Sequence, residues 1–175
     1  MKACLTMESG ALEFVFGKNH KLVFRTKAAS PEGVLEEIIL DGKTVAEWVF
    51  GEKAATIGAP VESEFMFAPH WNGGEFSEMP VEGVGSWCTG NSARTCKLSL
   101  KITGNEKLTT AAGTFDAVRL EGWITFKEVA TGSGQVTIWY SKDHRRPLKQ
   151  TAEIQGRYYT FKETIELSAI RTVAR

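Results

Sequence analysis

The sequence predicts an all-β protein with a single domain over residues 1–175, built from about ten hairpin-connected antiparallel strands. Two observations predict this architecture. Ten phenylalanines and many Thr, Val and Ile residues favour strands over helices. Turn residues, among them 17 glycines, recur about every 8–12 positions, which is the spacing of short strands in an all-β domain. No Pro/Ser-rich linker or fixed-period repeat divides the chain.

Charge and hydropathy narrow the classes of partner. The sequence holds 21 basic and 21 acidic residues and its pI is about 6.8, so no net field attracts nucleic acid or an acidic membrane. No apolar run approaches the roughly 20 residues that a membrane-spanning helix needs. Residues 1–8 also lack the apolar segment of a signal peptide, so we expect either a cytoplasmic protein or the mature form of an exported one.

The segment ALEFVFGKNHKLVFRTK predicts the first hairpin, because large apolar residues alternate with polar or smaller ones on both sides of a turn. A three-residue loop ending at His20 would pair Phe14 with Phe24 and Glu13 with Arg25. This register places the large apolar groups on one face and an ion pair on the other. His20 is then a residue of the loop tip, not a ligand.

The segment VLEEIILDGKTVAEWVF predicts a second hairpin around Asp41-Gly42, because Asp-Gly is a strong short hairpin signal. A helix is the alternative: Ser30-Pro31 resembles an N-cap followed by proline at the first helical position, with a helical face running to Leu40. We favour the hairpin, because the turn and the strand that follows it explain more residues.

Two further strands are predicted by FDAVRLEGWITFK and QVTIWYSK, and QTAEIQGRYYTFKETIELSAIRTV supplies the last two. A loop around Thr131 would place Tyr140 opposite Gly122, so that the aromatic ring covers the gap left by the glycine. The same register places Trp123 opposite Trp139 on the more polar face. Two facing tryptophans are either cross-strand packing, which we favour, or part of a binding surface.

The cysteines predict no metal centre. Seven residues separate Cys88 from Cys96, and no His lies beside them. In a zinc knuckle only about two to four residues separate the two ligating cysteines. Two interpretations remain open for this pair, a disulfide across a hairpin or two free, packed thiols. A disulfide would indicate an oxidising compartment and leave Cys4 as the odd thiol. We expect no metal and no cofactor.

The segment FAPHWNGGEF gathers His70, Trp71, Asn72 and Glu75 around two glycines. Loops often carry function, so this segment is a candidate site. A simple connection between strands explains the same residues.

The segment SKDHRRPLK is the other candidate site. Asp143, His144, Arg145 and Arg146 could hold an anion. A charged hairpin turn, with Pro147 entering an edge strand, explains them equally.

Three segments, MPVEGVGSW, ITGNEKLTTAAGTFDAVRLEG and IWYSKDHRRPLKQ, together resemble a broad group of bacterial exported proteins of unknown function. The strongest element is the run AGTFDA at 112–117, and the sequence departs from the group's pattern at Met79, Val81 and Ala111. The resemblance implies that the strands form a curved antiparallel sheet (a half-barrel or open barrel) similar to that of periplasmic lipoprotein carriers, and export as a periplasmic protein or lipoprotein. It implies no catalytic residues. In this architecture Gly113 would allow the chain to turn, and Phe115 would plug one end of the sheet.

These observations lead to three hypotheses. The first is a non-enzymatic exported protein that holds an apolar or amphipathic ligand, or a protein partner, on the curved sheet. The second is a small β-barrel enzyme with a site around His70 and Glu75 or around His144 and Arg145. The third is a structural or interaction domain that recruits a partner at an exposed sheet edge. The predicted ligand-binding residues of the first hypothesis are His70, Trp71, Trp123, Trp139, Tyr140 and Arg145.

Overall fold

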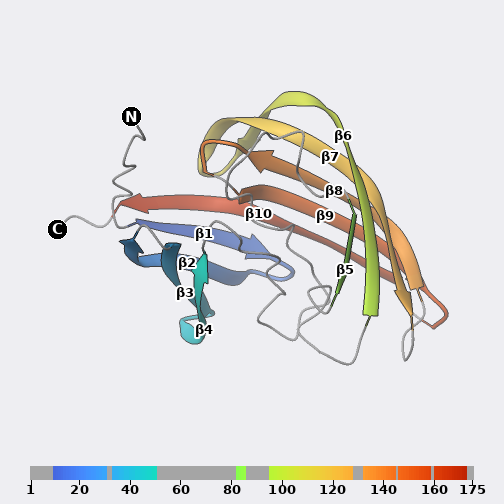
Figure 1. The fold of residues 1–175 in the computed structure, drawn as a ribbon, viewed down its shortest axis with the longest axis horizontal. Coiled ribbons are helices and arrows are strands. Elements are labelled where there is room, and N and C mark those ends of the chain that lie inside the picture. The colour runs from blue at the N-terminus through green and yellow to red at the C-terminus, as the bar shows by residue number, and fades with distance from the viewer. Residues whose placement is uncertain are drawn as a thin grey trace.

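The computed structural model describes residues 10–30, 33–50, 82–85, 95–127, 132–144, 146–158 and 160–172. These residues form one antiparallel sheet of ten strands in the order β4-β3-β2-β1-β10-β9-β8-β7-β6-β5 (Figure 1). The predicted all-β fold is confirmed, and the described residues contain no helix. The strands are β1 (Gly10–Phe16), β2 (His20–Ser30), β3 (Gly33–Leu40), β4 (Lys43–Phe50), β5 (Glu82–Gly85), β6 (Thr95–Thr110), β7 (Gly113–Lys127), β8 (Gly132–Ser141), β9 (Arg146–Gly156) and β10 (Thr160–Thr172).

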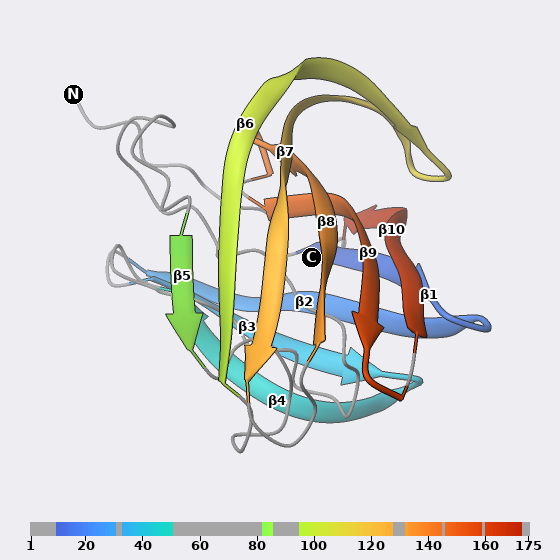
Figure 2. The ribbon, with the colours of Figure 1, turned by 90° about the vertical axis from the view of Figure 1, so that its right-hand side faces the viewer.

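The sheet is open, with β4 and β5 at its two edges, and it is strongly curved. Strand β1 pairs with β10, so the first and last described strands lie side by side. In Figure 2 the strands β2 to β4 cross behind β5 to β8, which run nearly perpendicular to them. We call β1–β4 the N-terminal half of the sheet and β5–β10 its C-terminal half. The hydrophobic core contains inward-facing residues from both halves: Phe14, Leu22, Phe24, Ile38, Leu100, Leu108, Ala117, Leu120, Ile124, Val136, Ile138, Tyr140, Leu148, Ala152, Ile154, Ile165 and Leu167.

The first hairpin forms as predicted, but the predicted register is wrong by two residues. Phe14 lies opposite Leu22, not Phe24. The turn occupies residues 17–19, where Gly17 and Asn19 have φ of 54° and 74°, so the chain reverses one residue earlier than expected. A shift of two keeps every side chain on its predicted face. Phe14 and Phe24 still touch as diagonal neighbours, edge to face, with ring centroids 5.7 Å apart.

The ion pair predicted between Glu13 and Arg25 is also wrong, for the same reason. With the shifted register, Arg25 reaches Glu37 on β3 at 3.2 Å. Glu13 instead pairs with Arg171 on β10 at 2.5 Å. Arg25 therefore pairs with the next strand along the chain, and Glu13 pairs with the last described strand.

The hairpin around Asp41-Gly42 is confirmed, and the alternative helix is wrong. Asp41 and Gly42 have φ of 48° and 84°, so both central residues adopt the left-handed conformation of a type I′ turn. Strands β3 and β4 pair on either side of it.

Strands β6 and β7 form a long hairpin that curves over one end of the core (Figure 2). The register of the β6–β7 pairing shifts between Ile102 and Gly104, and this shift marks a bulge at which the strand bends. Gly113 follows the turn with a φ of 138°, as the sequence led us to expect. Leu108 of this hairpin belongs to the core, and Phe115 packs against the core and is partly buried.

The faces predicted for β7 and β8 are confirmed, whereas their register is wrong by four residues. Tyr140 lies opposite Val118, and Gly122 lies opposite Val136. The cause is the Gly-Ser-Gly segment at 132–134, which looks like a loop but is the start of β8. A Cβ on Gly134 would lie 2.0 Å from the Glu153 carbonyl oxygen, so this glycine allows β9 to approach β8 closely.

Strand β9, which contains Pro147, is a central strand between β8 and β10. The expectation that Pro147 enters an edge strand is therefore wrong. Pro147 lies opposite Tyr140, next to a register shift between Trp139 and Tyr140. At such a bulge the missing N–H of proline does not interrupt a regular ladder.

Candidate functional site

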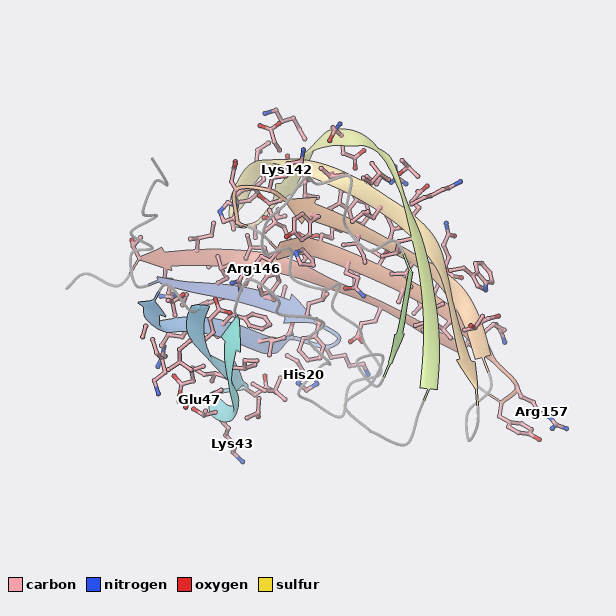
Figure 3. All side chains as sticks on the ribbon, viewed as in Figure 1. His20, Lys43, Glu47, Lys142, Arg146 and Arg157 are labelled. Atoms are coloured by element: carbon pink, nitrogen blue, oxygen red, sulfur yellow. The ribbon has the colours of Figure 1, made fainter. Side chains whose placement is uncertain are left out.

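The interior of the fold contains a buried ion pair that joins its two halves. Arg146 of β9 donates from Nη2 to Oε1 of Glu36 on β3 over 2.5 Å. The two side chains are only 8% and 2% exposed. The Arg146 guanidinium also lies over the Phe24 ring, 5.4 Å from its centroid. Figure 3 shows Arg146 in the middle of the molecule, between β10 and the strands of the N-terminal half.

This pair is incompletely hydrogen-bonded. Oε2 of Glu36 and Nε of Arg146 are buried and find no partner among the described residues. Removing two charges from water costs several kcal/mol each, and the cost is recovered only when the remaining donors and acceptors are also satisfied. The ion pair between the two halves therefore leaves one buried acceptor and one buried donor without a hydrogen bond among the described residues.

Gln150 is the second polar side chain of the interior. It is fully buried on β9. Its register partners are Ile138 on β8 and Ile165 on β10, both apolar and buried. Neither Oε1 nor Nε2 of Gln150 has a hydrogen-bond partner in the described part of the chain. Buried polar atoms in native proteins are usually satisfied by protein, ordered water or ligand, so this amide marks a place where a polar group is expected.

The outer face of the same strands carries a polar row that is paired, which we call the outer ladder: Glu106, Arg119, Trp139, Lys149 and Glu166. The Trp139 ring lies between the cations of Arg119 and Lys149, each 5.7 Å from its centroid. Its indole N–H donates to Glu106, and Lys149 pairs with Glu166 at 2.6 Å. Within the ladder Trp139 is a packing residue, as the sequence favoured.

The predicted pairing of Trp123 with Trp139 is wrong, because of the register of β7 and β8. Trp123 lies opposite Gln135, while Trp139 lies opposite Arg119. Trp123 is 52% exposed on the outer face, whereas Tyr140 is buried in the core. The structure therefore does not bring these three predicted ligand-binding residues together.

The remaining predicted site residues lie outside the described residues. These are His70, Trp71, Asn72, Glu75, Cys88 and Arg145. The backbone of Cys96 lies in β6, opposite Gly85 of β5 and Phe126 of β7, whereas the predicted turn between Cys88 and Cys96 lies outside the described residues. The pairing of Cys88 with Cys96 stays a prediction.

His144 stabilises the turn between β8 and β9. Its backbone N–H donates to Oγ of Ser141, and Nδ1 lies 3.0 Å from the same oxygen. The edge of its ring meets Phe115, with centroids 5.4 Å apart. Burial lowers the pKa of His144, and the Arg146 charge lowers it further against the opposing effect of Asp143. Ser141 is 1% exposed, so its hydroxyl is part of the turn rather than an accessible nucleophile.

A second histidine contact was not predicted from the sequence. Nδ1 of His20 lies 2.8 Å from Oδ2 of Asp41, and Oδ1 of Asp41 accepts from the Lys21 backbone N–H. These hydrogen bonds, first that of Lys21 and then that of His20, lower the pKa of Asp41. Both side chains are about half exposed, at 55% and 46%, and they join the two hairpin turns of the N-terminal half.

Across the described residues no group of three His, Cys, Asp or Glu side chains is placed to hold a metal ion. In the same part of the chain no helix is long and apolar enough to cross a membrane.

Two interior residues, Glu36 and Gln150, were missed by the sequence analysis, although a signal exists for each. Glu36 has the same alternation phase as Ile38 in β3, and Gln150 shares the phase of Ala152 and Ile154 in β9. A polar residue at an apolar position of a two-residue period indicates an inward-facing polar group.

No family model and no curated protein matches the chain. Solved structures do. A candidate exported protein of Bacteroides fragilis with a YmcC-like fold matches with a TM-score of 0.62 and 15% identity, over 94% of this chain and 96% of that one. A candidate lipoprotein of Parabacteroides distasonis matches with a TM-score of 0.54 and 15% identity, over 94% and 95%. At this identity the likeness is one of architecture, and this chain shares the fold of these two proteins along nearly its whole length.

Proposed function

We propose that this protein is a non-enzymatic protein of the bacterial cell envelope that binds an apolar or amphipathic ligand between the two halves of its curved sheet. The observation that carries the proposal is the Gln150 amide, which is buried without a hydrogen-bond partner in an aliphatic surrounding. A core residue that served only packing would be apolar, because an unpaired buried amide costs about 1–3 kcal/mol.

The rest of the interior suits a ligand with an acyl or similar chain. Leu148, Ile154 and Ile165 give Gln150 aliphatic neighbours along β9 and β10. The two edges of the sheet, β4 and β5, are not paired with each other, so the sheet is open at this side. Hydrogen-bonding atoms and apolar surface together are the usual composition of a small-molecule site.

The location in the envelope is supported by the two structures of the same fold. One is described as a candidate exported protein and the other as a candidate lipoprotein. The sequence resemblance to bacterial exported proteins points in the same direction. Fractionation of cells that express the full-length gene product tests this part: recovery in the cytoplasmic fraction alone would contradict it.

Native mass spectrometry after incubation with a bacterial envelope lipid extract tests ligand binding. We expect a one-to-one adduct and a higher melting temperature, because a ligand at 100 times its Kd stabilises the folded state by about 2.7 kcal/mol. Absence of both an adduct and a shift would overturn the proposal.

Two variants locate the site. Leu148→Phe adds volume to the interior and should weaken the adduct at least about tenfold, while Trp123→Ala on the outer face should leave it unchanged. The reverse result would place the ligand on the outer face.

A further inference from the structure

The electrostatic balance of the interior indicates which kind of polar group its ligand carries. Among the described residues, the charged side chains that are buried are Glu36 and Arg146, and they neutralise each other. A ligand ion placed beside them would have no spare counter-charge. Because a charge in an apolar interior is costly unless it is paired, an anionic or cationic head is disfavoured there.

The unpaired atoms themselves call for both kinds of hydrogen bond. Oε2 of Glu36 and Oε1 of Gln150 are acceptors, whereas Nε of Arg146 and Nε2 of Gln150 are donors. The two β9 residues are four positions apart, with buried Leu148 between them. A group that only accepts or only donates would leave half of these atoms unsatisfied.

We infer that the interior binds the uncharged head of an amphiphile, a hydroxyl-rich or amide group that both donates and accepts, with its apolar chain against the aliphatic core. This inference rests on the proposed function and specifies the class of ligand. The Gln150 amide is its main recognition element, and the Glu36–Arg146 pair excludes charged heads because it is already neutral.

Ordered water is the competing occupant. Water also donates and accepts, and it fills polar sites in protein interiors about once per 27 residues. The two occupants differ in their consequences. If water alone satisfies Gln150, replacing this side chain changes no amphiphile affinity.

Three amphiphiles with the same twelve-carbon chain and different heads provide the test: monolauroylglycerol, laurate and dodecyltrimethylammonium. Titration calorimetry at pH 8, below the critical micelle concentration, gives each Kd. We expect the glyceride to bind at least about tenfold more tightly than either ion. Gln150→Leu should weaken the glyceride about tenfold, as expected for one lost pair of hydrogen bonds, and leave both ions unchanged.

Gln135→Leu is the matched control, because Gln135 is the exposed glutamine of the neighbouring strand β8. It should change none of the three affinities. Gln150→Met, which is close to glutamine in size, separates the loss of the amide from a change of volume, and urea denaturation confirms that each variant is folded.

The outcomes distinguish the two proposals. If none of the three compounds and no component of the lipid extract binds, the proposed function fails and this inference fails with it. If amphiphiles bind but an ion binds as tightly as the glyceride, or Gln150→Leu and Gln150→Met keep full glyceride affinity, the neutral-head inference is overturned while the proposed function stands.

Discussion

Strands β8 and β9 carry polar side chains on both of their faces, and the two faces differ sharply. On the outer face Trp139 and Lys149 belong to a row in which each charged side chain has a counter-ion. Nε of Arg119, in the same row, is also buried without a partner in the described part of the chain. In the interior, Nε of Arg146 and both amide atoms of Gln150 are buried without a partner among the described residues.

Strand packing explains the polar residues of the outer face but not the unpaired polar residues of the interior. Exposed ion pairs contribute about 0–1 kcal/mol each and stabilise the sheet without any ligand, so the outer ladder is accounted for by strand packing. The interior polar groups reduce stability relative to apolar residues of the same size. Residues that reduce stability are often found at functional sites, and this supports the interior site that we propose.

Removing one partner of the interior pair should have the largest effect. Glu36→Leu leaves Arg146 buried without a counter-ion, and we expect a loss of about 3–5 kcal/mol in the free energy of unfolding, measured by urea denaturation. The matched outer variant Glu166→Leu also breaks one ion pair and should cost under about 1 kcal/mol.

The double variant Glu36→Leu/Arg146→Met tests whether the loss in Glu36→Leu comes from the uncompensated charge of Arg146. It removes both charges and should return to within about 1 kcal/mol of the wild type. A double variant as unstable as Glu36→Leu would show that the pair contributes shape rather than balanced charge.

Gln150→Leu should change stability in the opposite direction. Leucine fills nearly the same volume without an unpaired amide, so we expect the free energy of unfolding of the ligand-free protein to rise by about 1–2 kcal/mol. The exposed control Gln135→Leu should stay within about 0.5 kcal/mol. A loss of stability in Gln150→Leu would mean that the amide is satisfied in the folded protein, and the contrast between the two faces would weaken.

Within the outer ladder, Trp139→Phe keeps an aromatic ring between the two cations but removes the N–H that reaches Glu106. We expect a loss of about 1 kcal/mol, from the hydrogen bond and from the weaker attraction of cations to phenylalanine. Trp123→Phe, at an exposed position of the same face, should cost under about 0.5 kcal/mol. Equal losses in the two variants would mean that the ladder contributes nothing specific.

The contrast between faces also shows how far the sequence can predict this structure. The face of each residue follows from a local two-residue period, and Ile124, Ile138 and Leu167, which lie at alternating apolar positions of their strands, are buried. Register depends on where a loop ends and on bulges, and these are not local. Gly134 looks like a loop residue, yet it is needed where β9 approaches β8.

The candidate site was predictable only in part. The Glu36–Arg146 contact joins residues 110 positions apart, on strands β3 and β9 that are not neighbours in the sheet. The inward direction of Glu36 could be predicted from its phase in β3, but its partner could not. The predicted packing of Trp139 against Trp123 is wrong, because the neighbours of Trp139 on the outer face are the cations of Arg119 and Lys149.

The pH dependence of His144 should be the smallest effect, and it probes the position where the β6–β7 hairpin meets the β8–β9 turn through Phe115. Burial and the nearby Arg146 charge lower the pKa of His144 below its ordinary value, so the folded state favours the neutral ring. A group with a lowered folded-state pKa contributes stability above its unfolded pKa of about 6.5 and loses it as pH falls through the folded value. Wild-type stability should therefore decrease between pH 7 and pH 5.5, by less than about 1 kcal/mol because the half-exposed ring is screened by solvent.

His144→Phe is the control for this prediction. It keeps a ring against Phe115 and has no proton to gain, so its unfolding free energy should depend less on pH over this interval. Parallel curves for the two proteins would show that the contact between the hairpin and the turn is insensitive to the charge of His144.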